Sequence, residues 1–222
     1  MSLKNIDPQT ITYYELNNQI NIPVNGQIPL NKDQDALAAF LKENVAPNTK
    51  QFDSFQARLA YLLDHNYLER DFLKAYSPEF PEKLYNWLHQ AGFHFKSFMA
   101  AYKFYAQYAL KTDDGAYYLE HFADRVWANA LYFGDGDEKL AQDLADEMIH
   151  QRYQPATPSF LNAGRSRRGE LVSCFLLQTT DDMNSIGRTI NSALQLSRIG
   201  GGVGIHLTNL RQIGKASGRG SV

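Results

Sequence analysis

Residues 170–210 constrain the fold most, because they carry the pattern of a single parallel β-α-β unit. Residues 170–178 are short and apolar like a strand, residues 183–198 repeat apolar side chains at helical spacing, and residues 204–210 are apolar again. Strands that a helix joins in this order pair in parallel. Two parallel strands are too few for a sheet covered on both faces, so we expect further polypeptide to complete this domain.

The residues before this unit predict a mainly helical region. Apolar side chains recur every three or four positions, and Asp33 and Ser77 stand where helix N-caps are expected. Residues 155–169, which are rich in Pro, Gly and Arg, are expected to form a loop. We therefore divide the chain into a helical domain, residues 1–165, and the start of an α/β domain, residues 166–222. The expected helices cover residues 33–46, 54–65, 69–75, 78–91, 98–109, 118–133 and 137–151.

The composition is that of a globular protein without a basic excess. The 222 residues are 44% apolar and carry a net charge of −2, which disfavours a dedicated nucleic-acid or membrane-surface binder. No apolar run approaches the roughly 20 residues that span a bilayer, and the N-terminus lacks the apolar core of a signal peptide. The single cysteine rules out an internal disulfide and suits a reducing compartment. We expect a soluble, cytoplasmic protein that binds neither nucleic acid nor membrane.

The cysteine, Cys174, lies on the first predicted strand, between a polar turn and a glycine-rich loop. A free cysteine on a strand is most often a small buried apolar residue. The alternative is a reactive thiol that uses the two flanking segments. A cysteine–histidine nucleophile has no supporting local signature.

A metal site is not indicated. The chain has no second cysteine, and His150 and His206 lie at no ligand spacing. The histidines of the helical region share no site spacing with its acidic residues, and we interpret both as surface or core-edge groups; these histidines are His65, His89, His94 and His121.

The glycines at positions 200, 201, 202 and 204 follow a predicted helix. A dinucleotide fingerprint has the opposite order, because there the glycines join a strand to a following helix. The run is either a helix C-cap with a tight turn or a place where the backbone closely approaches a ligand, which glycine permits.

Residues 157–164 form a second segment with two interpretations. Their prolines and the Asn-Ala-Gly end suit a loop without function, whereas their hydroxyls and N–H groups suit a phosphate ligand. The following Arg165, Arg167 and Arg168 are either a solvated basic loop or anion ligands.

The start of the helix at residue 183 also has two interpretations. Asp181 or Asp182 with Ser185 is a helix-start signature. It indicates simple capping or, because a helix N-terminus attracts negative charge, an anion site.

Three motifs together resemble one enzyme family. They are ATPSFLNAG at residues 156–164, LVSCFL at residues 171–176 and RIGGGVGI at residues 198–205. In this order and spacing they resemble the large, catalytic subunit of class I ribonucleoside-diphosphate reductase, and residues 48–58 (NTKQFDSFQAR) resemble the helical N-terminal region of subclass Ib. The resemblance covers nearly the whole chain. It implies a helical region followed by a ten-stranded α/β barrel, of which this chain would hold the first strand–helix–strand unit.

The resemblance implies roles at the substrate site. Thr157, Ser173 and Gly202 match positions that contact the substrate nucleoside diphosphate. Cys174 also contacts substrate and matches the first cysteine of the redox pair. That pair delivers two electrons to the ribose 2′-carbon and closes to a disulfide.

The resemblance also implies an allosteric site and partners. Asp181 and Arg211 match the specificity-effector region, where a deoxynucleoside triphosphate or ATP selects the base that is reduced. The aspartate would accept from the effector's ribose hydroxyl and the arginine would pair with its phosphates. The family uses no cofactor within this region. It uses a radical-generating small (β) subunit with a metal–radical centre and a thioredoxin- or glutaredoxin-type reductant, and residues 183–198 match a helix of its homodimer interface.

The chain also departs from the family pattern. The second redox cysteine, the thiyl-radical cysteine and the C-terminal shuttle cysteines are absent. The N-terminus is short for a full ATP-cone domain, and residues 214–222 do not resemble the family's continuation.

Three functions follow from these observations. The chain is the N-terminal part of a reductase large subunit and inactive alone, or half of a split reductase that a second chain completes at the exposed strand edge. The third alternative is a non-catalytic, nucleotide-binding regulatory domain. We take the first as the prediction and the split enzyme as its variant.

Overall fold

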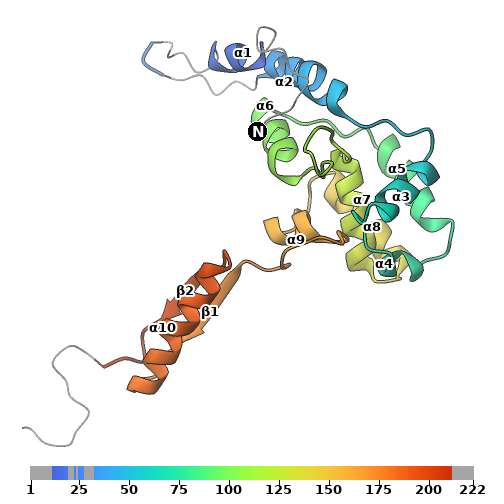
Figure 1. Cartoon of the computed structure of the whole chain (residues 1–222). Helices are drawn as coiled ribbons and strands as arrows, with labels where there is room; N and C mark the ends of the chain where they lie inside the picture. The colour runs from blue at the N-terminus through green and yellow to red at the C-terminus, as the bar shows by residue number, and fades with distance from the viewer. Residues whose placement is uncertain (1–11, 20–22, 24, 28–32, 212–222) are drawn as a thin grey trace, which may run out of the picture. The chain divides into compact units, whose positions relative to one another are not determined.

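The computed structural model describes residues 12–19, 23, 25–27 and 33–211, and the chain divides into two compact units. The first unit comprises Met1–Gly169 and is helical; the second comprises Glu170–Val222 and is a β-α-β unit (Figure 1). The predicted architecture, a mainly helical region followed by an incomplete parallel sheet, is therefore confirmed. The prediction about residues 214–222 lies outside the described residues.

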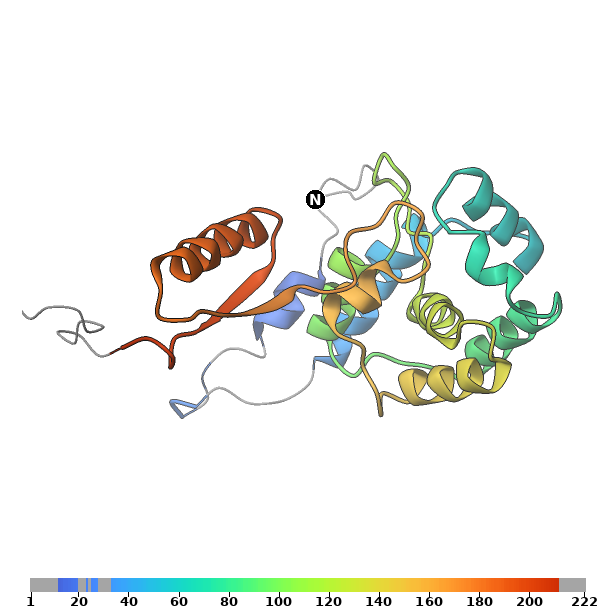
Figure 2. The same ribbon diagram turned by 90° about the horizontal axis from the view of Figure 1, so that it is seen from below.

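The helical unit is built around α7 (Phe122–Gly134). Eleven of its 13 residues are buried, as expected of a helix surrounded by other helices. It contacts α4, α5, α8 and α9, and Figure 2 shows it end-on among them. The remaining elements, in chain order, are α1 (Tyr13–Gln19), α2 (Gln34–Phe40), the π-helical turn η2 (Leu41–Val45), the 3₁₀ turn η3 (Ala46–Asn48), α3 (Phe55–Asp64), α4 (Asp71–Lys74), α5 (Phe80–Gln90), α6 (Phe98–Lys103), the π-helical turn η4 (Phe104–Tyr108), α8 (Glu138–Ile149) and α9 (Thr157–Asn162).

Side-chain caps begin several of these helices. Asp33 Oδ1 accepts from the Ala36 N–H at 2.7 Å, which confirms Asp33 as the N-cap of α2. Ser54, Ser97 and Asp137 cap α3, α6 and α8 in the same way.

Tertiary contacts move the predicted start of α7 from residue 118 to Phe122. Tyr118 is instead extended, and its N–H donates to Asn48 O at 2.7 Å while its C=O accepts from Lys50 N at 3.0 Å. Its ring is buried and its hydroxyl donates to Asn44 Oδ1 at 3.0 Å. Pairing with residues 48–50 thus replaces the first helical turn.

Two other predictions, a helix cap at Ser77 and a loop without a helix at residues 155–169, are wrong. Ser77 does not cap α5, which begins at Phe80 with Pro81 in its first turn; the Ser77 hydroxyl donates to Glu138 Oε1 at 2.5 Å instead. The expected loop at residues 155–169 contains α9, with Pro158 in the first turn, where a missing N–H costs nothing. Gly164, with a positive φ of 75°, follows the end of this helix.

The second unit consists of β1 (Cys174–Gln178), α10 (Met183–Arg198) and β2 (Gly202–His206). The strands are parallel, and Cys174 pairs with Gly202 at the start of the ladder. The helix agrees with residues 183–198. β1 is shorter than the predicted 170–178, and β2 begins two residues before the predicted 204–210 and ends at His206. Within this unit α10 lies along one face of the two strands (Figures 1 and 2).

Gly134 allows α7 and α8 to approach closely. A Cβ atom there would lie 2.8 Å from Ala141 Cβ and 2.5 Å from the Tyr76 hydroxyl, which donates to Leu131 O. We expect Gly134→Ala to lower the free energy of unfolding by about 1–3 kcal/mol through overpacking. Urea unfolding followed by circular dichroism measures this change.

The matched control is Gly187→Ala in α10, where nothing lies within 4 Å of the new methyl group. Alanine has the higher helix propensity, so this change should stabilise α10 by up to about 1 kcal/mol. Equal losses for both variants would contradict the close-approach explanation.

Candidate functional site

Cys174 lies on the uncovered face of the two-stranded sheet. Side chains alternate between faces along a strand, and Phe175 and Leu177 are the half-buried residues of β1 while Cys174 and Leu176 are exposed. Leu176 is 91% exposed. The interpretation of Cys174 as a small buried apolar residue is therefore wrong within this unit, where the thiol is accessible.

The surroundings of the thiol are small and polar. Ser173 precedes it, with Oγ 3.9 Å from Cys174 Sγ, and Ser173 O accepts from the Gly202 N–H at 2.6 Å. Gly202 pairs with Cys174 across the ladder and has no side chain to cover it. The structure thus brings together three of the predicted substrate-site residues.

The glycines of the loop have different requirements. Gly200 has a φ of 91° and follows α10, which fits the C-cap interpretation. A Cβ on Gly201 would lie 2.7 Å from the Phe175 ring and 3.0 Å from Leu196 O, so packing requires this glycine. A Cβ on Gly202 would make an ordinary contact at 3.4 Å. Packing within this unit does not demand Gly202, and the ligand interpretation stays open for it.

Asp181 and Arg211, the predicted effector residues, form an ion pair. Arg211 Nε lies 2.7 Å from Asp181 Oδ2, and Arg211 Nη2 donates to the Asp181 backbone carbonyl at 3.4 Å. Both side chains are about one-third exposed. Residues 30 positions apart in the sequence therefore combine into one partly accessible charged pair.

The start of α10 beside this pair is capped by Asp182. Its Oδ1 accepts from the Ser185 N–H at 2.8 Å and its Oδ2 from the Thr180 hydroxyl at 2.7 Å. The Thr180 hydroxyl, followed by the Ser185 N–H, lowers the pKa of Asp182 below its ordinary value. The capping interpretation of this segment is confirmed, with Asp182 as the cap.

Thr157, the fourth predicted substrate residue, is the first residue of α9 in the helical unit. Its Oγ1 lies 3.1 Å from the Tyr108 hydroxyl. Both residues line a cavity of about 200 Å³ that also includes Lys103, Gln154 and Phe160. Thr157 and Cys174 belong to different compact units.

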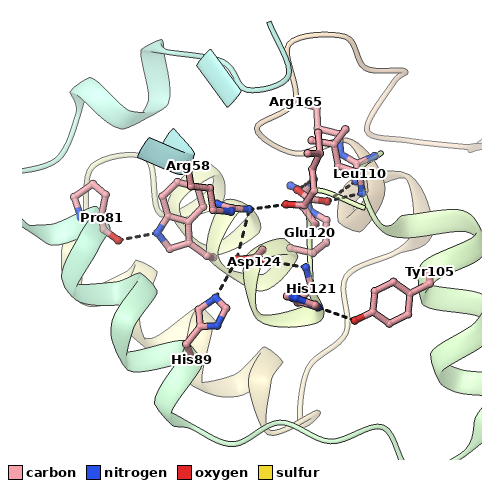
Figure 3. Close-up of polar contacts among 12 residues, drawn as sticks. Arg58, Pro81, His89, Tyr105, Leu110, Glu120, His121, Asp124 and Arg165 are labelled. Carbon is pink, nitrogen blue, oxygen red and sulfur yellow. Dashed lines mark hydrogen bonds and ion pairs between the residues drawn. The ribbon is translucent and has the colours of Figure 1, made fainter. Parts of the chain in front are cut away.

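Sequence analysis missed a buried ion-pair network in the helical unit (Figure 3). Glu120 Oε1 lies 3.2 Å from Arg125 Nη1, and Glu120 Oε2 lies 2.7 Å from Arg165 Nη2 and accepts from the Leu110 N–H at 3.0 Å. Burial alone would raise the pKa of Glu120, but the charges of Arg125 and Arg165 lower it below its ordinary value. Burial lowers the pKa of Arg125 to about 10, although Glu120 opposes this change.

A second buried carboxylate, Asp124, lies four residues further along the chain, in the first turn of α7. It contacts Arg58 at 3.5 Å and His89 Nε2 at 3.0 Å, and it accepts from the His121 N–H at 2.6 Å. Burial would raise its pKa, but Arg58, His89 and that N–H together lower the pKa to about 2. Burial lowers the pKa of His121, whose Nδ1 lies 2.8 Å from the Tyr105 hydroxyl.

These contacts correct two interpretations. Glu120 and Asp124 are buried rather than surface or core-edge groups, whereas the half-buried His121 fits the core-edge interpretation. Arg165 is buried rather than part of a solvated loop. Arg167 and Arg168 are paired with Asp113 and Glu69 at 2.8 and 3.0 Å. A sequence signal existed, because Glu120 and Asp124 interrupt the apolar pattern of the α7 segment at helical spacing.

Among the described residues, no group of three or more His, Cys, Asp or Glu side chains is arranged to hold a metal ion. The described helices include none that is long and apolar enough to cross a membrane.

Comparison with family models divides the chain into three matches. Residues 13–93 match "Ribonucleotide reductase N-terminal", residues 94–168 match "Ribonucleotide reductase, all-alpha domain", and residues 172–221 match "Ribonucleotide reductase, barrel domain". These matches leave few residues of the chain unassigned.

Curated relatives agree with these matches. The chain is 43% identical over 208 residues to the ribonucleoside-diphosphate reductase subunit alpha of Bacillus subtilis (strain 168). The aligned region covers 94% of this chain and 30% of the relative. It is 44% identical over 204 residues to the NrdEB subunit alpha of the same organism, covering 92% of this chain and 19% of the relative. The subunit alpha of Mycoplasma pneumoniae is 42% identical over 216 residues, with coverage of 96% and 30%. The chain thus spans less than a third of the length of these relatives.

The contacts of Asp124 with Arg58, His89 and the His121 N–H predict an acid-sensitive contribution to the free energy of unfolding. The folded pKa of about 2 lies below the ordinary 3.8, so the stabilisation is complete above about pH 4 and is lost as the pH falls toward 2. We expect it to amount to about 2 kcal/mol. At pH 7, Asp124→Asn should cost about 3 kcal/mol, because it leaves Arg58 buried without its counter-charge.

Urea unfolding at pH 7 and at pH 3 measures both effects. The difference in free energy of unfolding between wild type and Asp124→Asn should be smaller at pH 3 than at pH 7. Asp143→Asn is the control, because Asp143 forms an exposed pair with Lys139. A pH-independent difference would contradict the role assigned to the Asp124 charge.

Proposed function

Because the chain belongs to the ribonucleotide reductase large-subunit family, as its N-terminal part, we propose that it supplies the first cysteine of the redox pair that reduces ribonucleoside diphosphates to deoxyribonucleoside diphosphates. The observation that carries the proposal is the exposed Cys174 thiol on the uncovered sheet face beside Gly202. A non-catalytic regulatory domain would not require an accessible thiol in this position.

The chemistry needs a second thiol in addition to Cys174, the one cysteine of residues 1–222. As Cys174 and that partner close to a disulfide, they release two protons and two electrons. The ribose 2′-carbon gains a C–H bond, and its hydroxyl group leaves as water. A thioredoxin- or glutaredoxin-type reductant would then restore both thiols.

Four residues are proposed to contact the substrate. We assign Ser173, Gly202 and Cys174 to the side of the ribose, and Thr157 to a further contact with the nucleoside diphosphate. The Ser173 hydroxyl and the Thr157 hydroxyl offer hydrogen bonds, and Gly202 offers a close backbone approach. The geometry within the second unit supports the first three assignments.

The Asp181–Arg211 pair is proposed as the contact for a deoxynucleoside triphosphate or ATP effector. Arg211 is partly exposed and already oriented by Asp181, so an effector phosphate would add a second anionic partner. In this proposal the pair binds the effector nucleotide, including ATP, and this binding controls the subunit allosterically.

We also propose three partners. A radical-generating small (β) subunit would start the reaction, and further polypeptide, which a second chain could supply, would complete the sheet. Self-association as a homodimer is supported by a stripe of exposed apolar residues on α10, with Met183 81%, Ile190 54% and Leu194 64% exposed. The proposed location of this chemistry is the cytoplasm.

Replacing the thiol tests the catalytic role. In a complete large subunit that carries these residues, assayed with its radical-generating subunit, Cys174→Ser should reduce formation of deoxyribonucleoside diphosphate by about three orders of magnitude or more. The serine hydroxyl has a similar size but cannot form the disulfide. Chromatography of the nucleotide products measures the loss.

The control is Val172→Ala, which removes an exposed apolar side chain two residues earlier and should leave turnover nearly unchanged. Near-normal turnover by Cys174→Ser would refute the proposed function. Labelling of residues 1–222 alone, without denaturant, with a thiol reagent should find one accessible thiol per chain.

Replacing Arg211 tests the effector site. Arg211→Ala should weaken binding of deoxynucleoside triphosphates, measured by calorimetry, about tenfold or more, because a charge-assisted hydrogen bond to phosphate is lost. Arg198→Ala removes the same charge at the other end of α10 and should change the affinity less than about twofold. Equal losses in both variants would indicate general electrostatic attraction instead of a site.

A further inference from the structure

One face of α9 presents two different groups to Tyr108. Thr157 and Phe160 are three residues apart and therefore neighbours on the helix surface. The rings of Tyr108 and Phe160 lie 5.8 Å apart, and the Tyr108 hydroxyl lies 3.1 Å from Thr157 Oγ1. Phe160 is buried and anchors α9 in the core, so Tyr108 connects this anchor to the polar start of the helix.

The backbone of Tyr108 is itself fixed by the buried ion pair. Its carbonyl oxygen accepts from Arg165 Nη2, and the same nitrogen lies 2.7 Å from Glu120 Oε2. Glu120 also accepts from the Leu110 N–H, two residues after Tyr108. The phenol ring therefore projects from a segment that is held at two points.

A threonine side chain has few χ1 rotamers, and a hydrogen bond to its hydroxyl selects among them. The Thr157 hydroxyl has one hydrogen and two lone pairs, so the contact with Tyr108 leaves capacity for a ligand. The two hydroxyls line the same cavity of about 200 Å³. The direction in which Thr157 offers its remaining hydrogen-bonding capacity is thus set by Tyr108.

We propose that Tyr108 is a positioning residue for the substrate: its hydroxyl orients the Thr157 hydroxyl toward the nucleoside diphosphate. This inference rests on the substrate role assigned to Thr157 under the proposed function. Tyr108 acts through Thr157 and does not touch the reacting atoms.

The test is a double-mutant cycle in a complete large subunit that carries these residues, assayed with its radical-generating subunit. Tyr108→Phe keeps the ring on Phe160 and removes only the hydroxyl. It should raise KM for the ribonucleoside diphosphate about fivefold, the effect of one hydrogen bond, with kcat changed less than about twofold. Thr157→Val should raise KM at least as much, and the double variant should match Thr157→Val alone, because Tyr108 acts only through that hydroxyl.

Tyr117→Phe is the control, since Tyr117 is an exposed tyrosine outside this cavity, and its KM should equal that of wild type. An unchanged KM in Tyr108→Phe, with a raised KM in Thr157→Val, would overturn this inference and leave the proposed function intact. An unchanged KM in Thr157→Val would overturn both the positioning role of Tyr108 and the substrate contact assigned to Thr157. Thermal unfolding midpoints distinguish positioning of Thr157 from a merely structural role of Tyr108. A structural role predicts a lowered midpoint in Tyr108→Phe. It also predicts that the increase in KM caused by Tyr108→Phe adds to the increase caused by Thr157→Val.

Discussion

The buried carboxylate of Glu120 is the interaction on which the helical unit depends most. It lies between Arg125 and Arg165, and these arginines also donate to the carbonyl oxygens of Ala163 and Tyr108. One acidic group thereby ties the residues before α7 to the end of η4 and to the segment after α9. Loss of one partner would leave a buried charge without its counter-charge, so the network ties three chain segments together.

The sequence predicted the elements best where local signals decided them. The range of α10 agreed with residues 183–198 because Asp182 caps its start and Gly200 adopts a positive φ after its end. The predicted helix start at residue 118 and the predicted cap at Ser77 were wrong because distant partners decided them. Tyr118 bonds to residues 48–50 and Ser77 bonds to Glu138, and neither partner is visible in a local pattern.

The candidate site was predictable in part for the same reason. The alternation of Phe175 and Leu177 with Cys174 and Leu176 contains the information that the thiol faces away from α10, but only once the position of that helix is known. The resemblance assigned Asp181 and Arg211 to one region, but it did not predict that the two side chains form an ion pair with each other. The buried role of Asp124 was missed because charged residues at helical spacing look alike on a surface and in a core.

The solitary thiol on the open sheet face has a consequence for the redox state of the molecule. This chain cannot form an internal cystine, because it contains one sulfhydryl group. Every disulfide formed by Cys174 must therefore join it to sulfur from another molecule or from further polypeptide. In residues 1–222, titration of the one free sulfhydryl therefore reports directly whether Cys174 has been oxidised.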